Sequence, residues 1–284
     1  MKLKNILVFI SVLFVFTQCT KEASVKLPES DPKPVLVCFI SPDDSLIKVN
    51  LTNSIPLYTG NTKTYPKIIN NATISISNGN SSAVIPWIND SLGYRLSTKQ
   101  FAIVSGTTYQ LDITIPDGRK LSATTKVPST SFPSLNSKRN KIQLDSNEFN
   151  VSYQVDYEFN WQDNPGEGNY YRIVYYTLIY DSNLYRDTVA EAMVDQFEND
   201  QGKDGSKMMF KASSFEIYQT GNPMPLSVSQ PIYFIICNKD YFDYHRDLSI
   251  NNDDNPFSEA KINYTNIVGG IGCFGAYGLV KKRI

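Results

Sequence analysis

Three glycines near the end of the sequence have the spacing of a phosphate-binding loop. Gly270, Gly272 and Gly275 spell G-x-G-x-x-G, which binds a dinucleotide where it joins a strand to a helix. That function needs a unit of about 30 residues and an acid about 20 residues further on. Because the sequence after Gly275 is too short for this, we expect no nucleotide cofactor. We predict instead that the glycines serve a bend or a close backbone approach beside a strand.

The other residue types that support catalysis or metal binding are sparse or badly spaced. His245 is the single histidine, and we expect a packed or surface role because no serine or cysteine nucleophile pattern accompanies it. No group of His or Cys has zinc-site spacing. The pairs Asp43-Asp44 and Asp253-Asp254 do not fit the twelve-residue calcium loop with its glycine and closing glutamate. We expect solvated turn residues there, and no metal.

The cysteines suggest one modification and leave one pairing open. Cys19 follows a short apolar segment and is the candidate for lipid attachment. Cys38 lies in the apolar run PVLVCFI, which is typical of a buried small hydrophobic residue. Cys237 and Cys273 could form a disulfide in an oxidising cell envelope, but their geometry decides this and the sequence does not give it.

The N-terminus is similar to a bacterial lipoprotein signal. Lys2 and Lys4 precede an apolar core at 6–16 that is too short to span a bilayer, and Cys19 follows it. We predict a signal peptide at 1–18 and acylation of Cys19. An ordinary secretory peptide with an incidental cysteine is the alternative.

The residues after Cys19 are polar and rich in proline, which predicts a tether at 19–34 that lifts the folded part off the membrane. Lys21 and Glu22 resemble the lysine-plus-acid signal that sends some Bacteroidetes lipoproteins to the cell surface. The predicted location is therefore the outer membrane, with a preference for its outer face.

From residue 35 onward the hydrophobic pattern has a period of two. In the segment LIKVNLTN, Ile47, Val49 and Leu51 share one face and polar residues share the other. Short alternating strands separated by turn signals predict an immunoglobulin-like β-sandwich at 35–128. The proline- and serine-containing stretch 129–141 is the predicted linker.

A second β-sandwich domain is predicted at 142–284. Its strands include NVSYQVDYEFNW, NYYRIVYYTLIY and PIYFIICN, and one short amphipathic helix near 240–250 is expected, capped by Asn238 or Asp240. We place the glycine run in an edge or closing strand of this domain, with Phe274 and Tyr277 packed inward. The fold class is thus mainly all-β, with two sandwich domains.

Composition excludes some partners and suggests others. Lys+Arg 27 against Asp+Glu 28 leaves no basic footprint for nucleic acid. Aromatic residues are 12% of the chain, and we expect most of them in the core. Some tyrosines could line a platform for a sugar or peptide, because tyrosine combines a large apolar area with a polar tip.

The order of several segments resembles the domain-of-unknown-function 4249 family of Bacteroidetes cell-envelope lipoproteins. The segments are the lipoprotein start, NPGEGNYYRI, the tyrosine-rich helix after PIYFIICN, and NPFSEAKINYTNIVGGIGCFGAYG. The resemblance implies no catalytic residues. It implies a relation to accessory proteins of TonB-dependent outer-membrane transporters.

We therefore expect a membrane-anchored, non-enzymatic binding or accessory lipoprotein for nutrient uptake, with the ligand unknown. The first alternative is a surface hydrolase in which acids such as Glu158 and Asp163 face one cleft, although no spacing supports that pair. The second is an adhesion or structural module.

Overall fold

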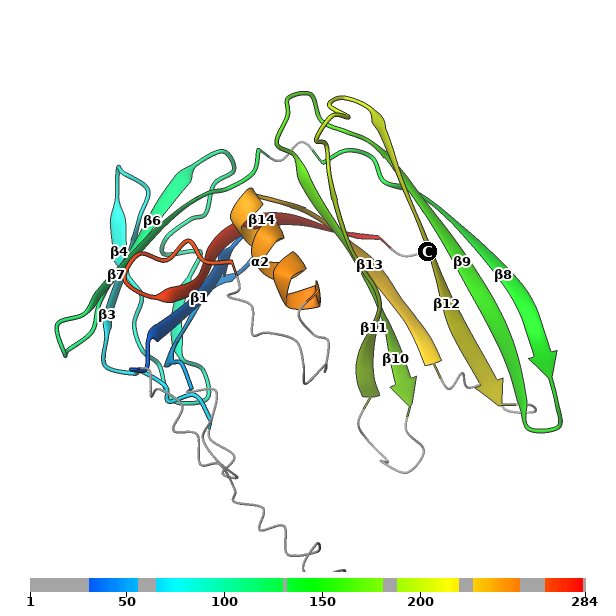
Figure 1. Cartoon of the computed structure of the whole chain (residues 1–284), viewed down its shortest axis with the longest axis horizontal. Coiled ribbons are helices and arrows are strands. Elements are labelled where there is room, and N and C mark those ends of the chain that lie inside the picture. Colours follow the sequence, from blue (N-terminus) through cyan, green and yellow to red (C-terminus); the bar gives the residue numbers. More distant parts are fainter. Residues whose placement is uncertain are drawn as a thin grey trace, which may run out of the picture. The chain divides into compact units, whose positions relative to one another are not determined.

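The computed structural model describes residues 31–55, 65–129, 132–180, 188–219, 227–250 and 264–282. Cys19, the predicted signal peptide and Asp253-Asp254 lie outside these residues. The described part consists of strands with one helix, which confirms the expected mainly all-β class (Figure 1). No helix within the described ranges is long and apolar enough to cross a membrane.

The first half of the chain forms two facing sheets around one core. Leu36, Ile74, Tyr109 and Leu111 have no exposed surface and belong to this core. Inward and outward residues alternate along each strand, so the period-two pattern predicted these faces correctly. The strands are β1 (Pro34–Ile40), β2 (Leu46–Asn53), β3 (Thr73–Ser77), β4 (Ser82–Val84), β5 (Tyr94–Ser97), β6 (Thr108–Thr114) and β7 (Lys120–Lys126).

The later strands build a second core that is richer in aromatic rings. A three-stranded sheet, in which β9 (Asn150–Gln162) lies between β12 (Lys207–Gln219) and β8 (Asn136–Ser146), contributes Tyr157, Phe159 and Trp161. Facing strands contribute Tyr171 and Phe234, and the Trp161 ring lies 5.4 Å and 5.3 Å from these two rings. The strands are β8 (Asn136–Ser146), β9 (Asn150–Gln162), β10 (Tyr170–Tyr180), β11 (Thr188–Asn199), β12 (Lys207–Gln219) and β13 (Ser227–Cys237).

Strand β14 (Ile271–Lys282) joins the strands of both cores into one sheet with the order β11-β10-β13-β14-β1-β2-β5. Its first half pairs in parallel with β1, and its second half pairs antiparallel with β13. The prediction of an edge or closing strand was therefore wrong, because β14 is interior. Phe274 is buried in the first core, not the second. The division of the chain at 129–141 stays a prediction, but one sheet holds strands from both sides of it.

The glycine run allows β14 to lie against its neighbours. Gly272 has a φ of +116°, and a Cβ atom there would lie 2.0 Å from the carbonyl oxygen of Leu36. At Gly269, with a φ of +82°, a Cβ atom would lie 2.2 Å from the carbonyl oxygen of Lys120. Only glycine tolerates this combination of backbone angle and distance. The predicted close backbone approach is confirmed.

Two asparagines extend the ladder of β14 beyond the end of β13. Asn266 accepts from the Phe274 N–H and donates to its carbonyl, both at 2.9 Å. Asn238 makes a similar pair of bonds with Ala276. Its side-chain oxygen accepts from the Ala276 N–H, and its backbone N–H donates to the Ala276 carbonyl, both at 3.0 Å. The backbone groups of a buried strand are satisfied in this way.

Asn238 also starts the helix α2 (Lys239–Ile250), as the sequence predicted. Its side-chain oxygen accepts from the Tyr241 N–H at 3.1 Å, which is an N-cap, and its amide donates to the Thr125 hydroxyl at 2.8 Å. One residue therefore connects α2, β14 and β7.

Helix α2 lies beside β14, against the face of the seven-stranded sheet that points away from the two cores (Figure 1). Tyr241 and Phe242 are buried there, and a Cβ atom on Gly275 would lie 3.0 Å from that of Tyr241. His245 stacks on the Tyr241 ring at 4.0 Å, and burial lowers the pKa of its imidazole to about 4. His245 is thus neutral at pH 7 and packed, in agreement with the sequence prediction.

Candidate ligand-binding cleft

Two pockets lie beside the residue at which α2 begins. One has a volume of about 660 Å³ and the other about 530 Å³, and Gly168, Tyr170 and Lys239 line both. We call these neighbouring pockets the α2 cleft. Its walls are the β9–β10 loop, the start of α2, the end of β7 and the β11–β12 turn. The charged residues of its lining are Lys126, Glu167, Asp200, Lys239, Asp243 and Arg246.

Asp163 fixes the start of the β9–β10 loop. Its side chain is buried, and its two carboxylate oxygens accept from the Tyr171 hydroxyl at 2.6 Å and from the Gly205 N–H at 2.9 Å. Burial and the bond to Asp163 raise the pKa of Tyr171 well above its usual range, so the phenol stays protonated and donates. The start of the loop is thus tied to both β10 and the β11–β12 turn.

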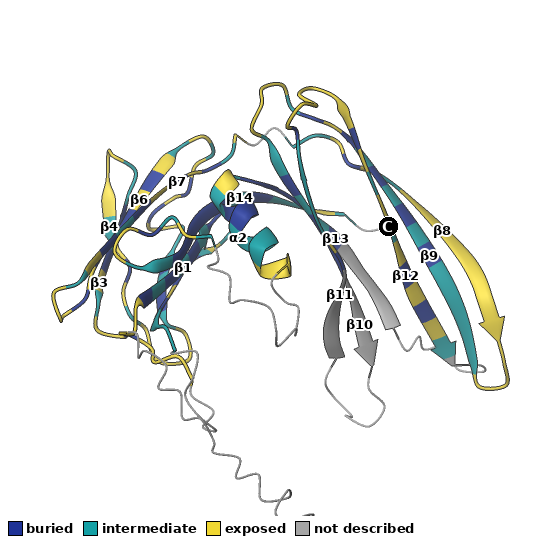
Figure 2. Ribbon diagram, in the orientation of Figure 1, coloured by how far each residue is buried: buried dark blue, intermediate teal, exposed yellow. Residues whose placement is uncertain are grey.

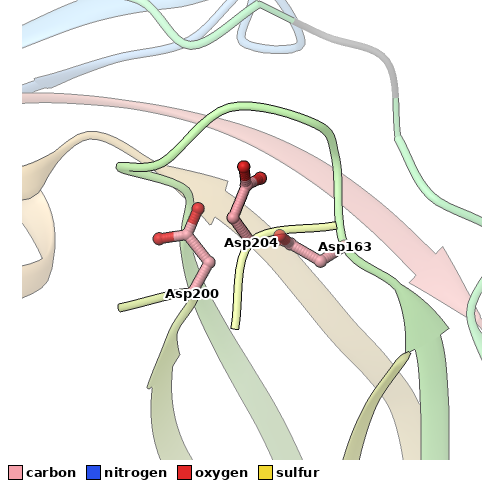
Figure 3. A group of neighbouring side chains, drawn as sticks. All are labelled: Asp163, Asp200 and Asp204. Carbon is pink, nitrogen blue, oxygen red and sulfur yellow. The ribbon is translucent and has the colours of Figure 1, made fainter. Parts of the chain in front are cut away.

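Two further aspartates fix the rest of the same loop. Asp200 accepts from the N–H groups of Gly168 at 3.0 Å and Asn169 at 3.1 Å. Asp204 accepts from the Gly166 N–H at 2.7 Å. Figure 3 shows the three carboxylates gathered where the two loops meet. Sequence reasoning did not identify Asp200 and Asp204, although their position among glycines in NDQGKDG is a turn signal.

Among the described residues, these three aspartates have the geometry that is nearest to that of a cation site. One ligand oxygen from each of Asp163, Asp200 and Asp204 lies within 4.8 Å of the others. Carboxylate oxygens suit calcium. Their hydrogen bonds to four loop N–H groups and to the Tyr171 hydroxyl, however, explain why they gather. The expectation that the chain holds no metal stays a prediction.

The helix side of the cleft carries a charge cluster. The Asp243 carboxylate pairs with Lys239, one helical turn earlier, and with Arg246 at 3.2 Å. The hydrogen bond to Asp243 raises the pKa of Lys239. The Tyr170 ring lies 5.0 Å from that of Phe242 and stands between the two pockets. This arrangement can bind a polar ligand through side-chain hydrogen bonds and a partly exposed ring.

A model of the family described as a domain of unknown function, DUF4249, matches residues 20–283. The chain belongs to the DUF4249 family. The resemblance seen in the sequence is thereby confirmed over nearly the whole chain. No curated protein matches the chain. In this DUF4249 protein, NPGEGNYYRI forms the loop and strand start that line the α2 cleft.

The acids considered for a hydrolase do not share a cleft in this DUF4249 chain. Glu158 lies on the outer face of β9, where it pairs with Lys211 at 3.6 Å and accepts from Asn160 at 2.9 Å. Asp163 is buried at the end of the same strand and belongs to the loop network. Side chains five residues apart on a strand point to opposite faces, so the proposed pair was wrong.

The first aspartate pair joins the β1–β2 turn to β14. Asp43 accepts from the Leu279 N–H at 2.9 Å, and Asp44 accepts from the Tyr277 hydroxyl at 2.8 Å. These residues are therefore structural contacts, not only solvated turn residues. Tyr277 is half-buried beneath α2, next to the Tyr241 ring.

Cys38, Cys237 and Cys273 are buried and free. The register pairs Cys237 with Tyr277, and Cys273 lies four residues before Tyr277 in β14. At about 3.3 Å per residue, this exceeds the roughly 7 Å that a disulfide spans between Cα atoms. The proposed pairing was thus wrong. Lipid attachment to Cys19 lies outside the described residues and stays a prediction.

Proposed function

We propose that this protein is a lipid-anchored, non-enzymatic binding or accessory lipoprotein of the outer membrane, which serves nutrient uptake together with a TonB-dependent transporter. The observation that carries the binding role is the α2 cleft. Its two pockets fall within the usual range for ligand sites, roughly 300–1,000 Å³. The anchor rests on Cys19 and the apolar segment before it.

The cleft supports binding because its walls are held before any ligand arrives. Asp163, Asp200 and Asp204 fix the β9–β10 loop, and Asn238 fixes the start of α2. A site with pre-formed walls avoids most of the entropy cost of ordering loops on binding. Exposed side chains at its edge, such as Glu167 and Gln201, can then contact a ligand or a partner.

Co-purification from detergent-solubilised outer membranes tests the proposal. We expect the affinity-tagged chain to retain a TonB-dependent transporter, and Cys19→Ser to release the protein from the membrane fraction. Glu167→Gln combined with Tyr170→Ser should weaken the capture of ligand or transporter. Lys138→Gln, on exposed strand β8, is the matched control. Capture of no transporter by the native chain would refute the accessory role, and retention of Cys19→Ser in the salt-washed membrane would refute the anchor.

A further inference from the structure

One end of the three-stranded sheet exposes several large apolar side chains. Ile142 is 45% exposed, Phe215 58% and Ile217 42%, all on the outer face. Leu144 is 51% exposed at a bulge in β8, and Phe149 is 73% exposed in the turn before β9. We call these five residues the apolar end. Contiguous apolar patches on a soluble surface mark interaction or membrane sites.

The register places the apolar residues of β12 and β8 on either side of Ser152 and Gln154 of the central strand β9. Phe215 and Ile142 flank Gln154 from opposite sides, so the three form one row across the sheet. Ile217 lies two residues beyond Phe215 on the same face. Toward the middle of the sheet this face becomes polar, with Asp156 accepting from Ser213 at 2.7 Å. Figure 2 shows β8 exposed along its length.

The inner face at the same end carries charges where a sandwich usually carries apolar side chains. Glu216 is 2% exposed and pairs with Arg139 at 2.6 Å and Lys141 at 2.8 Å. The Lys141 ammonium also lies 4.1 Å and 4.2 Å from the ring centres of Tyr153 and Tyr218. A strand shifted by one residue would bury Phe215 and Ile217 and expose Glu216. The ion pairs of Glu216 therefore favour the observed register, in which the apolar side chains point outward.

We propose that the apolar end inserts into the headgroup–acyl boundary of the bilayer that holds the protein. This inference rests on the anchor in the proposed function. Residues 19–33 span at most roughly 50 Å, so the folded part stays within reach of the membrane. Asp145 and Glu148 are exposed beside Phe149, which disfavours an anionic lipid surface. The lipid is therefore zwitterionic, and the binding is apolar.

A fluorescence experiment on the full, lipidated chain tests this. Phe149→Trp is compared with Met209→Trp, which reports from the other end of β12, where Met209 is 57% exposed. Each variant is reconstituted in phosphatidylcholine vesicles that contain brominated acyl chains. The native tryptophans, Trp87 and Trp161, are common to both variants and cancel in the difference. Circular dichroism confirms that each variant folds.

We expect the Phe149→Trp emission to shift to the blue and to be quenched by bromine, while Met209→Trp stays unchanged. Adding phosphatidylglycerol or salt should not strengthen the quenching. Equal quenching of both variants, or none, would overturn the proposal. A blue shift of the Phe149→Trp emission that occurs only in a co-purified protein complex would also overturn it, because a protein and not lipid would then cover the apolar end. Mass analysis of the Cys19 peptide reports the anchor separately, so the two proposals can fail independently.

Discussion

A methyl group added at Gly272 should destabilise the protein more than a glycine-to-alanine change in an open turn. In Gly272→Ala the new Cβ atom would lie 2.0 Å from the Leu36 carbonyl oxygen, where ordinary contact begins near 3.4 Å. Strand β14 must therefore move from β1 by more than an ångström. The left-handed backbone angle adds about 1–2 kcal/mol by itself.

The movement has further costs. Each interstrand hydrogen bond that is lost between buried strands costs about 1 kcal/mol or more. Phe274, which is fully buried in the first core, would also lose contacts. We therefore expect Gly272→Ala to cost at least about 4 kcal/mol, a large part of a typical total of about 5–15 kcal/mol.

Gly79→Ala separates backbone strain from the clash. Gly79 has a φ of +85°, but no atom lies within 4 Å of the place that its Cβ atom would take. We expect it to cost only the backbone term of about 1–2 kcal/mol. Urea denaturation, followed by circular dichroism, gives both values from the midpoints. If Gly272→Ala costs no more than Gly79→Ala, the close approach of β14 to β1 is refuted.

Three further predictions concern a charge, a cap and the thiols. Burial raises the pKa of Glu216, but hydrogen bonds from Lys141, Arg139 and Tyr218 outweigh it and lower the pKa to about 2. The unfolded value is about 4.3, so the stabilisation by Glu216 is full above that pH and is lost as the pH falls toward 2. Glu216→Gln should therefore destabilise more at pH 7 than at pH 2.5 in urea titrations, and an equal loss at both would contradict the ion pairs. Asn238→Ala should cost about 2–3 kcal/mol, since it removes a helix cap and three other hydrogen bonds, whereas Asn78→Ala, in an exposed turn, should cost far less. Thiol labelling of the unfolded, non-reduced mature chain should find Cys38, Cys237 and Cys273 reactive, and labelling of Cys38 alone would restore the disulfide.

Local patterns in the sequence predicted the elements well. Alternation fixed the faces of β2, β6 and β9, because a period of two describes any strand with one buried face. Asn238 marked the start of α2, because a side chain that caps a helix acts within four residues. His245 was expected to be packed or at the surface, and it is packed.

Long-range pairing could not be predicted in the same way. The β1 segment PVLVCFI and the β14 segment IGCFGAYG are both apolar, and neither pattern indicates which strand the segment pairs with. The disulfide failed for the same reason, since it depended on a distance across strands. The Glu158–Asp163 pair failed for a local reason, because side chains five residues apart along one strand point to opposite faces. The gathering of Asp163, Asp200 and Asp204 needed two loops far apart in sequence to meet.

The pairing of β14 also decides where the candidate site lies. Ala276 is held by Asn238, and Asn238 sets the first residue of α2 and so the position of Lys239 in the cleft. The absence of a side chain at Gly275 allows Tyr241 to pack close to the sheet, and this contact sets the distance between α2 and the sheet. A change that shifts β14 should thus widen or close the α2 cleft without touching its lining. The glycines that resemble a nucleotide loop therefore act on the shape of the α2 cleft indirectly, through the strand against which the helix packs.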